Sequence, residues 1–488
     1  MLISNMEARS IFQNISPLDH RYSVSEETLF NSLVPWISEE AAIAACVKAE
    51  IALIIAHLSV RGSAVTPEIR AALEKAAASI DPAEVYAEEE KTRHNIRAVV
   101  NVLKRKVPPE FAPLVHLGAT SVDILDTGLS FRMAGVTRAV ILPNLKKLEL
   151  LLCDFCKREA QTPQIGRTHG QHAVPITLGF AIAEYVSRLG KSILEIEKRS
   201  AELKGKLAGA VGAYNASAMI VRNPEELERI YLAELGLEPS EHSTQLVEPE
   251  YLLRLLLEIN IAFGIIANLA DDLRHLQRSE IAELRESFAA DQVGSSTMPH
   301  KRNPWNSEHV KSLWKAFMPR VTTFFMDQIS EHQRDLSNSA SQRFIADYIT
   351  GFCLAVSRMI FIIEGLGVDR RRMLINLLEN SGGIAGGVLA EPAYILLAES
   401  GVPDAHEIIR KITLNAEKEG ISFAQALAKE PETLGRIGKK MAELGVITSP
   451  EDVLIFFEKP EQYSGLAAQK AQQLANKYLK LFKGDSNV

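Results

Sequence analysis

The segment from Gly294 to Pro304 gathers side chains that could carry out acid–base chemistry on a carboxylate-bearing substrate. It reads Gly-Ser-Ser-Thr-Met-Pro-His-Lys-Arg-Asn-Pro. Its glycine and two prolines are unsuited to a helix interior, so we expect an irregular loop. The serine hydroxyls, lysine, arginine and side-chain amide could supply a base, a compensating positive charge and hydrogen bonds to a carboxylate. A polar loop between two rigid helices also suits a catalytic lid.

Three segments resemble conserved blocks of the fumarase/aspartase superfamily. The loop matches the signature Gly-Ser-Ser-x-Met-Pro-x-Lys-x-Asn-Pro. Thr168–Gln171, which reads Thr-His-Gly-Gln, resembles the second block, and His116–Asp123 resembles the first. The resemblance implies a fumarate-releasing lyase with an all-α, fumarase/aspartase-like fold, in which a central long-helix bundle is flanked by two smaller helical domains.

Within the superfamily, the chain most resembles the adenylosuccinate lyase family. Ser16–Tyr22 is similar to a motif of that family whose Arg-Tyr pair grips the substrate phosphate, and Gln333–Ser339 followed by Arg343 also matches. In the C-terminal third, Glu458–Ala467 alone extends the resemblance. The family implies β-elimination of fumarate from adenylosuccinate, giving AMP, and from SAICAR, giving AICAR, in purine nucleotide biosynthesis. It implies neither a metal nor a cofactor.

The resemblance assigns catalytic roles to four residues. Ser295, six residues before Lys301, is the base that removes a proton beside a carboxylate. His169 is the acid that protonates the departing nitrogen, a role that suits an imidazole near neutral pH. Glu308 holds His169 in its working tautomer. Lys301 stabilises the doubly negative intermediate.

The same resemblance assigns a larger set of residues to substrate binding. Hydroxyl and amide side chains bind the substrate carboxylates, and arginines with their neighbours bind the phosphate, because guanidinium forks suit phosphate. Two further histidines position the substrate. These residues are Thr120, Ser121 and Gln245 for the carboxylates; Arg21, Tyr22, Arg334, Ser339 and Arg343 for the phosphate; His94 and His116 as positioning histidines; and, beside them or in the loop, Arg93, Asn95, Arg302 and Asn303.

Several alternatives stay open at this point. A 3-carboxymuconate cycloisomerase shares the loop style but usually lacks the acid histidine, and argininosuccinate lyase has a different loop ending. A catalytically inactive structural homologue would have no need of the four catalytic residues together. Ser296 is the alternative base. Asn95, His309 and Asn338 replace residues that are commoner in the family, and Asn95 in particular removes a negative charge beside an anion site.

Long apolar stripes must position these segments. Apolar residues recur every three or four positions from Leu252 to Leu276 and again from Ile182 to Leu207, without an intervening proline. This spacing predicts helices of about 25 to 30 residues that pack as a bundle. Leu29–Leu58 and Pro82–Lys106 also indicate helices. We divide the chain into an N-terminal helical domain (1–111), a central long-helix bundle with the signature loop (112–367) and a C-terminal helical domain (368–488).

Composition narrows the class of partner. The net charge of −7 disfavours nucleic acid as a partner but allows a small anionic substrate in a locally basic cleft. With four cysteines we expect no disulfide framework, and the Cys153–Cys156 pair reads as a buried helix face rather than a metal site. No uninterrupted apolar run suggests a membrane span, and we expect a cytoplasmic protein. Because the stripes exceed what one short bundle can bury, we expect a homo-oligomer, and the family implies a tetramer with shared active sites.

Overall fold

The computed structural model describes residues 10–288, 294–335, 337–379 and 383–483. It confirms the all-α fold, since the strands are few and short. The chain forms two compact units that each combine three separate stretches of sequence. Unit 1 comprises 1–145, 191–264 and 312–357, and unit 2 comprises 146–190, 265–311 and 358–488. The division into three sequential domains stays a prediction.

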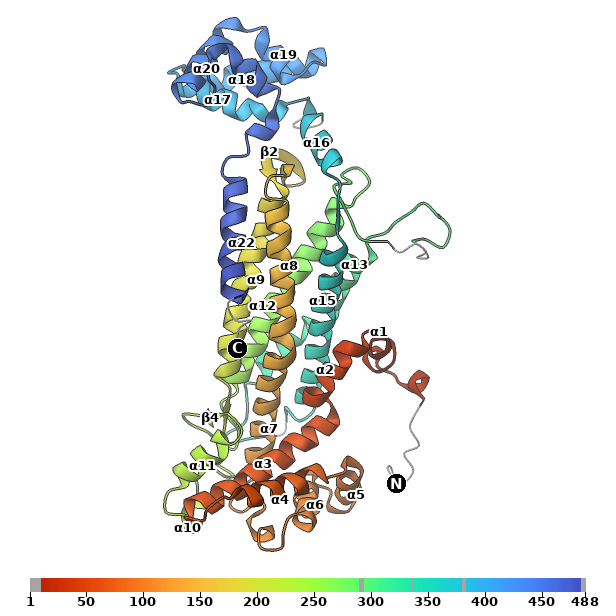
Figure 1. Cartoon of the computed structure of the whole chain (residues 1–488), viewed down its shortest axis with the longest axis vertical. Coiled ribbons are helices and arrows are strands. Elements are labelled where there is room, and N and C mark those ends of the chain that lie inside the picture. The colour runs from red at the N-terminus through yellow and green to blue at the C-terminus, as the bar shows by residue number, and fades with distance from the viewer. Residues whose placement is uncertain (1–9, 289–293, 336, 380–382, 484–488) are drawn as a thin grey trace. The chain divides into compact units, whose positions relative to one another are not determined.

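The elements of unit 1 are mostly helices, of which α3 is the longest at 22 residues (Figure 1). They are η1 (Ile11–Gln13), η2 (Leu18–Tyr22), α1 (Ser23–Ser25), α2 (Glu27–Ile37), α3 (Glu39–Val60), α4 (Pro67–Ala78), α5 (Pro82–Thr92), α6 (Asn95–Lys106), η3 (Ala112–Leu114), α7 (Ser121–Val136), η4 (Thr137–Ile141), β3 (Lys204–Gly205), α10 (Ser217–Ile220), α11 (Pro224–Ala233), β4 (Glu238–Pro239), α14 (Arg320–Met326) and η5 (Ser341–Phe344).

Unit 2 contains an antiparallel hairpin and a cluster of C-terminal helices (Figure 1). Its elements are β1 (Pro163–Thr168), β2 (Gln171–Thr177), β5 (Leu284–Arg285), β6 (Gly367–Val368), α16 (Arg370–Leu378), η7 (Gly387–Leu389), α17 (Ala390–Glu399), α18 (Ala405–Glu419), α19 (Phe423–Ala428), α20 (Pro431–Glu443), η8 (Pro450–Asp452), α21 (Val453–Phe457), η9 (Pro460–Gln462) and α22 (Ala467–Lys483).

The remaining helices have residues in both units. These are α8 (Leu142–Arg158), α9 (Leu178–Ala201), α12 (Glu250–Leu276), α13 (Trp305–Phe317) and α15 (Ile345–Gly365). The prediction of a helix from Leu252 to Leu276 is confirmed by α12. The second stripe was extended too far, because α9 ends at Ala201 and the chain enters strand β3 at Lys204. Leu203 and Leu207 are buried outside any helix, so apolar spacing continued where helical geometry did not.

The core of unit 1 is centred on α3, whose residues are buried on nearly all sides. Leu53, Ile54 and Ala56 are fully buried there, and α3 contacts α2, α4, α6, α7 and α11. Elsewhere in this unit, the rings of Phe263 and Phe352 pack edge to face, with centroids 5.4 Å apart. Close packing of this kind fixes the starts of α6 and α7, which carry predicted binding residues.

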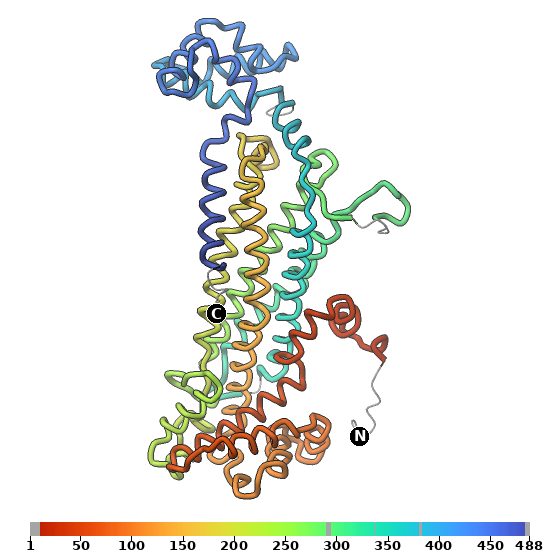
Figure 2. The backbone as a smooth tube through the Cα atoms, in the orientation of Figure 1, coloured from red at the N-terminus to blue at the C-terminus, as the bar shows by residue number. Residues whose placement is uncertain are grey.

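The C-terminal helices of unit 2 have a hydrophobic cluster of their own. It includes Phe423, Phe457 and Met441, and Figure 2 traces the chain through it from α16 to α21. Cys153 and Cys156 lie on α8 and are both buried, as predicted for a helix face. The Cys156 thiol donates to the carbonyl oxygens of Gly179 (3.1 Å) and Ala471 (3.3 Å). The pair therefore serves packing within this unit.

Three described stretches are long and apolar enough, by length and composition alone, to cross a membrane. They are Glu27–Val60, Glu250–Leu276 and Ser341–Gly365. In the fold, 72%, 56% and 72% of their most apolar windows are buried inside the protein. A hydropathy average over a window therefore finds more possible membrane spans than a search for uninterrupted apolar runs does. Packing inside the protein buries most of the apolar surface of these three stretches.

Candidate functional site

A cavity of about 570 Å³ in unit 1 gathers eight of the predicted binding residues. They come from four places: the start of α6, the start of α7, the loop before α12 and the segment between α14 and α15. The eight residues are His94, Asn95, Thr120, Ser121, Gln245, Arg334, Ser339 and Arg343. Segments distant in sequence thus converge on one space large enough for a small-molecule ligand.

Two helix starts face this cavity. Thr120 is the N-cap of α7 and forms a capping box with Asp123, in which the Thr120 N–H donates to Asp123 Oδ2 at 2.7 Å. His94 is the N-cap of α6, and its Nδ1 accepts from the Arg97 N–H at 3.3 Å. His94 Nε2 lies 3.4 Å from Ser121 Oγ. Helix N-termini favour anions, so the placement suits carboxylate or phosphate groups.

A hydrogen bond joins two of the predicted ligand-binding side chains on the other wall. Arg334 Nη1 donates to Gln245 Oε1 at 3.2 Å, and the Gln245 N–H donates to the Gln333 carbonyl at 3.4 Å. The loop before α12 and the segment after α14 are therefore held in register. Because an arginine of this kind offers several donors in a planar fork, donors remain available for a phosphate.

The residues of α7 that line the cavity extend the predicted set. Arg132 lines it, and its Nε donates to the Trp36 carbonyl at 2.6 Å. Burial lowers the pKa of Arg132. Asp126, which also lines the cavity, lies on the same helix. Sequence reasoning missed both, although projecting α7 as a helix could have found them. Arg132 lies on the helix face of Ser121, and Asp126 follows Val122, which also lines the cavity, by four residues.

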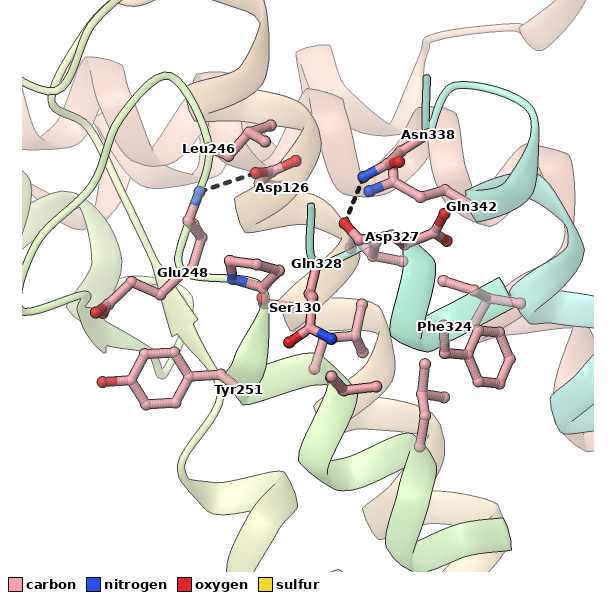
Figure 3. A pocket seen from close by; sticks show the side chains of 17 residues that line it. Asp126, Ser130, Leu246, Glu248, Tyr251, Phe324, Asp327, Gln328, Asn338 and Gln342 are labelled. Atoms are coloured by element: carbon pink, nitrogen blue, oxygen red, sulfur yellow. Dashed lines mark hydrogen bonds between the residues drawn. The ribbon is translucent and has the colours of Figure 1, made fainter. Parts of the chain in front are cut away.

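Asp126 also lines a second, smaller cavity of about 70 Å³ that shares lining residues with the first (Figure 3). It accepts a hydrogen bond from the Val247 N–H at 3.0 Å, which anchors the loop that carries Gln245. Burial raises the pKa of Asp126 to about 6, against the opposing effect of the Val247 hydrogen bond and of nearby cations. On the opposite side, Asn338 Nδ2 donates to the Asp327 carbonyl at 2.6 Å. The smaller cavity thus lies between the contact that anchors the Gln245 loop and the contact that anchors the segment around Asn338.

A buried ion pair fixes the first turn of α7 from behind. Asp123 and Lys206 are both fully buried and form a direct ion pair. Asp123 Oδ1 also accepts from the N–H groups of Ala208 (3.2 Å) and Gly209 (3.3 Å). A buried charge is tolerated only when it is paired and hydrogen-bonded, and these contacts satisfy that condition. The network positions Thr120 and the residue after it.

Arg21, Tyr22, Arg93 and His116 do not line this cavity in the described part of the chain. Arg21 and Tyr22 lie in η2, and Arg93 is the left-handed C-cap of α5, with φ 56°. The binding roles predicted for them stay predictions.

His116 also has a positive φ, 62°, and is clamped by one buried carboxylate. Glu50 Oε2 accepts from the His116 N–H at 2.8 Å, and Glu50 Oε1 lies 2.7 Å from His116 Nδ1. Next along the chain, the Leu117 carbonyl lies 2.8 Å from His57 Nε2. His57 is fully buried, as predicted for a packing residue, and burial lowers its pKa. With Nδ1 engaged by Glu50, Nε2 is the ring nitrogen of His116 that is left for a ligand.

The catalytic candidates fall in unit 2, where the signature loop is irregular, as predicted. Ser295 Oγ accepts from the Met298 N–H at 3.1 Å, and Asn303 Nδ2 donates to the Gly294 carbonyl at 3.1 Å. The second contact ties the two ends of the loop together. A donor aimed at a serine oxygen stabilises negative charge on it, which is what a serine base requires. Lys301 and Arg302 are exposed, and Arg302 lies over the Phe288 ring at 5.2 Å.

Helix α13 begins at Trp305, directly after the loop, and its first turn is capped by Glu286. Glu286 Oε2 accepts from the Asn306 N–H (3.1 Å) and Nδ2 (2.9 Å), and Glu286 Oε1 accepts from the Ser307 N–H (2.8 Å) and Oγ (2.5 Å). A carboxylate at a helix N-terminus is favourable. It fixes the turn that carries Glu308, which is exposed.

His169 occupies the tip of the β1–β2 hairpin, in a two-residue turn. His169 and Gly170 have φ values of 55° and 74°, and Thr168 pairs with Gln171 across the turn. Positive φ at both central positions is the pattern of a type I′ turn. His169 is exposed, and among the described residues no hydrogen bond joins it to Glu308. The predicted His169–Glu308 pairing is therefore not made within this single chain.

Comparisons with known proteins identify the family of the chain. Residues 8–316 match the Lyase family, and residues 330–444 match the family described as adenylosuccinate lyase C-terminal. The chain is 31% identical over 466 residues to the adenylosuccinate lyase of Pyrococcus abyssi, covering 95% of this chain and 97% of that protein. It is 29% identical to the adenylosuccinate lyase of Archaeoglobus fulgidus, covering 94% and 98%.

Solved structures share the fold. The 3-carboxy-cis,cis-muconate lactonizing enzyme from Pseudomonas putida superimposes with a TM-score of 0.76 at 24% identity, covering 93% of this chain and 98% of that one. A fumarate lyase from Mesorhizobium sp. BNC1 also gives 0.76, at 20% identity, covering 92% and 97%. At such identities the likeness bears on architecture alone.

Proposed function

Because this chain belongs to the adenylosuccinate lyase family and is a carbon–nitrogen lyase, we propose that it cleaves adenylosuccinate to AMP and fumarate, and SAICAR to AICAR and fumarate. Both reactions serve purine nucleotide biosynthesis. The observation that carries the proposal is the unit 1 cavity, which brings Arg334, Arg343 and Gln245 together with the helix starts of α6 and α7. Such a set of forks, amides and helix N-termini suits a ligand with one phosphate and two carboxylates.

In the proposed mechanism, the base and the acid act at neighbouring atoms of the substrate. Ser295, as its alkoxide, removes a proton from the carbon beside a succinyl carboxylate, and the electron pair moves into that carboxylate group. Lys301 and Asn303 stabilise the resulting charge. The pair then forms the fumarate double bond as the carbon–nitrogen bond breaks, and His169 gives its proton to the departing nitrogen. Ser295 gains one proton and His169 loses one, so the protons balance.

The proposal includes a homotetramer whose active sites are shared between subunits. Large apolar side chains are exposed on the long helices, among them Ile261 (53% exposed) on α12 and Phe361 (52%) on α15. Exposed apolar stripes on long helices favour self-association. Sharing would also supply His169 with a Glu308 from another subunit. We further propose a cytoplasmic enzyme, which four unpaired, buried cysteines support.

The test of activity is direct. The purified protein is mixed with adenylosuccinate, and AMP and fumarate are quantified by chromatography. We expect both products in equal amounts, with loss of nearly all turnover in Ser295→Ala and His169→Ala. Turnover of a 3-carboxymuconate without turnover of adenylosuccinate would overturn the proposal.

The sharing of sites is tested by mixing two inactive variants. Ser295→Ala and His169→Ala are each purified, combined, dissociated and reassembled. If Ser295 and His169 of one site come from different subunits, random assembly restores about a quarter of the sites. No recovery in a mixture that light scattering shows to be tetrameric would place both residues in one subunit.

A further inference from the structure

A single buried carboxylate holds the hairpin that carries His169. Glu283 is fully buried, and both of its oxygens are engaged. It accepts from Arg167 Nη2 (2.6 Å) and Nη1 (3.3 Å), from Gln164 Nε2 (2.8 Å) and from Asn376 Nδ2 (2.9 Å). Four donors thus converge on one side chain, two of them from a guanidinium fork. Charge-assisted fork pairs fix geometry as well as contributing energy.

Two of the three partners of Glu283 lie on the strand that leads into the turn. Gln164 and Arg167 both belong to β1, and Arg167 stands two residues before His169. Across the hairpin, Arg167 pairs with His172, next to the irregular step between Ile165 and Arg167. At that step Gly166 passes so close to β2 that an added Cβ would lie 2.7 Å from the Val174 carbonyl. The hairpin is therefore rigid up to the residue that precedes its tip.

Asn376 joins this contact to a third element of unit 2. Its Nδ2 also donates to the Ile281 carbonyl at 2.9 Å, so helix α16, the Glu283 segment and strand β1 meet at one point. The exposed ring of His169 gains its placement from the hairpin rather than from burial. A displacement of about 1 Å in a reacting group can cost about a hundredfold in rate.

We propose that Glu283 is a positioning residue for proton transfer by His169. It acts through Arg167 and Gln164, which fix the strand and hence the left-handed turn that aims the imidazole. This inference rests on the proposed function, because it takes His169 as the proton donor. Another buried carboxylate of this unit, Glu149, touches no residue of the hairpin in the described hydrogen bonds and provides a matched control.

The test is a double-mutant cycle built on adenylosuccinate cleavage. Glu283→Gln removes the charge and replaces one acceptor oxygen by a donor, which then faces the Arg167 guanidinium and either Asn376 or Gln164. We expect kcat to fall about 10- to 100-fold, while KM changes less than about twofold. In a His169→Ala background the same substitution should cost less than about twofold, because the group that it positions is absent. Glu149→Gln should leave kcat within about twofold of the parent.

The outcomes separate the two claims. If His169→Ala keeps most of its activity, the proposed donor is wrong. If His169→Ala is nearly inactive but Glu283→Gln costs the same factor in both backgrounds, Glu283 stabilises the fold without positioning the donor, and the inference is overturned. Circular dichroism and a melting curve accompany each variant. Should Glu283→Gln fail to fold, Arg167→Lys keeps the charge, loses the second fork contact and must show the same non-additivity.

Discussion

Glu149 allows a quantitative prediction about stability and pH. It lies on α8 with its side chain fully buried, and its Oε2 has no hydrogen-bond partner among the described residues. The other oxygen accepts from the Cys153 thiol, at 3.9 Å. Burial raises the pKa of Glu149 from 4.5 to about 9, and the thiol opposes this only in part. The folded protein therefore holds this carboxyl group protonated at neutral pH.

The direction in which the free energy of unfolding changes with pH depends on which state, folded or unfolded, binds the proton. Below about pH 4.5 both the folded and the unfolded chain carry it, so Glu149 adds no pH dependence there. As the pH rises towards 9, only the unfolded chain loses the proton, and the free energy of unfolding falls by about 1.4 kcal/mol per pH unit. At pH 7 the loss is about 3 kcal/mol. Between pH 5.5 and pH 8.5 it grows by about 4 kcal/mol.

Glu149→Gln removes this dependence because an amide does not titrate. Its buried NH₂ group adds a constant desolvation cost of about 1 to 3 kcal/mol, so the variant is expected to be similar to or less stable than the parent at pH 5.5 and more stable at pH 8.5. With about 2 cal/mol/K of unfolding entropy per residue, a chain of 488 residues shifts its melting temperature by about 1 °C per kcal/mol. The difference in melting temperature, variant minus parent, should rise by about 4 °C across this range.

Calorimetry at pH 5.5, 7.0 and 8.5 measures that difference. The matched control is Glu110→Gln, at an exposed glutamate, for which the difference should stay constant with pH. A difference for Glu149→Gln that is equally constant, or that falls as the pH rises, would refute the reasoning. Either result would mean that the folded chain ionises this carboxyl group without cost.

Three further substitutions test the site itself. In the parent, Asp126 gains a negative charge in the cavity as the pH rises through its raised pKa of about 6. Asp126→Asn removes that charge, so the change of KM for adenylosuccinate around pH 6 should become flatter. KM measured from pH 5 to 8 checks this. Arg334→Lys loses the fork geometry and should raise KM about tenfold or more with a smaller change in kcat, in steady-state assays. Glu286→Gln leaves the start of α13 with fewer hydrogen-bond acceptors. It should lower kcat about tenfold and speed limited proteolysis near the signature loop. An unchanged digestion rate would contradict a capping role for Glu286.

Much of the binding site could be predicted because its residues sit at the starts of helices or within matching motifs. Thr120 and His94 are N-caps, and a polar residue directly before an apolar periodic run marks the start of a helix. Gln245, Arg334 and Arg343 were identified by resemblance, and the structure places them in one cavity. The periodicity that predicted α12 also held to its last residue.

Other features could not be predicted, because the signal was absent or ambiguous. Thr168–Gln171 was identified as a block, but nothing in its composition indicated a hairpin with two left-handed residues; a histidine in that conformation is uncommon. Leu203 and Leu207 continued a helical stripe after the helix had ended. Glu283 looks like any surface glutamate in the sequence, since only the fold brings four donors to it.

The two kinds of function are supported in physically different ways. Four binding residues of unit 1 sit at the starts of α6 and α7, whose positions follow from a buried apolar core and from the Asp123–Lys206 pair. The acid and base candidates of unit 2 lie on a turn and a loop, where burial cannot fix them. Glu283 and Glu286 take over that task, three residues apart on one short segment, the first for the hairpin and the second for the helix after the loop. Because the two clamps share a backbone, a displacement of strand β5 would disturb both catalytic elements together, so substitutions there should lower kcat before they alter substrate affinity.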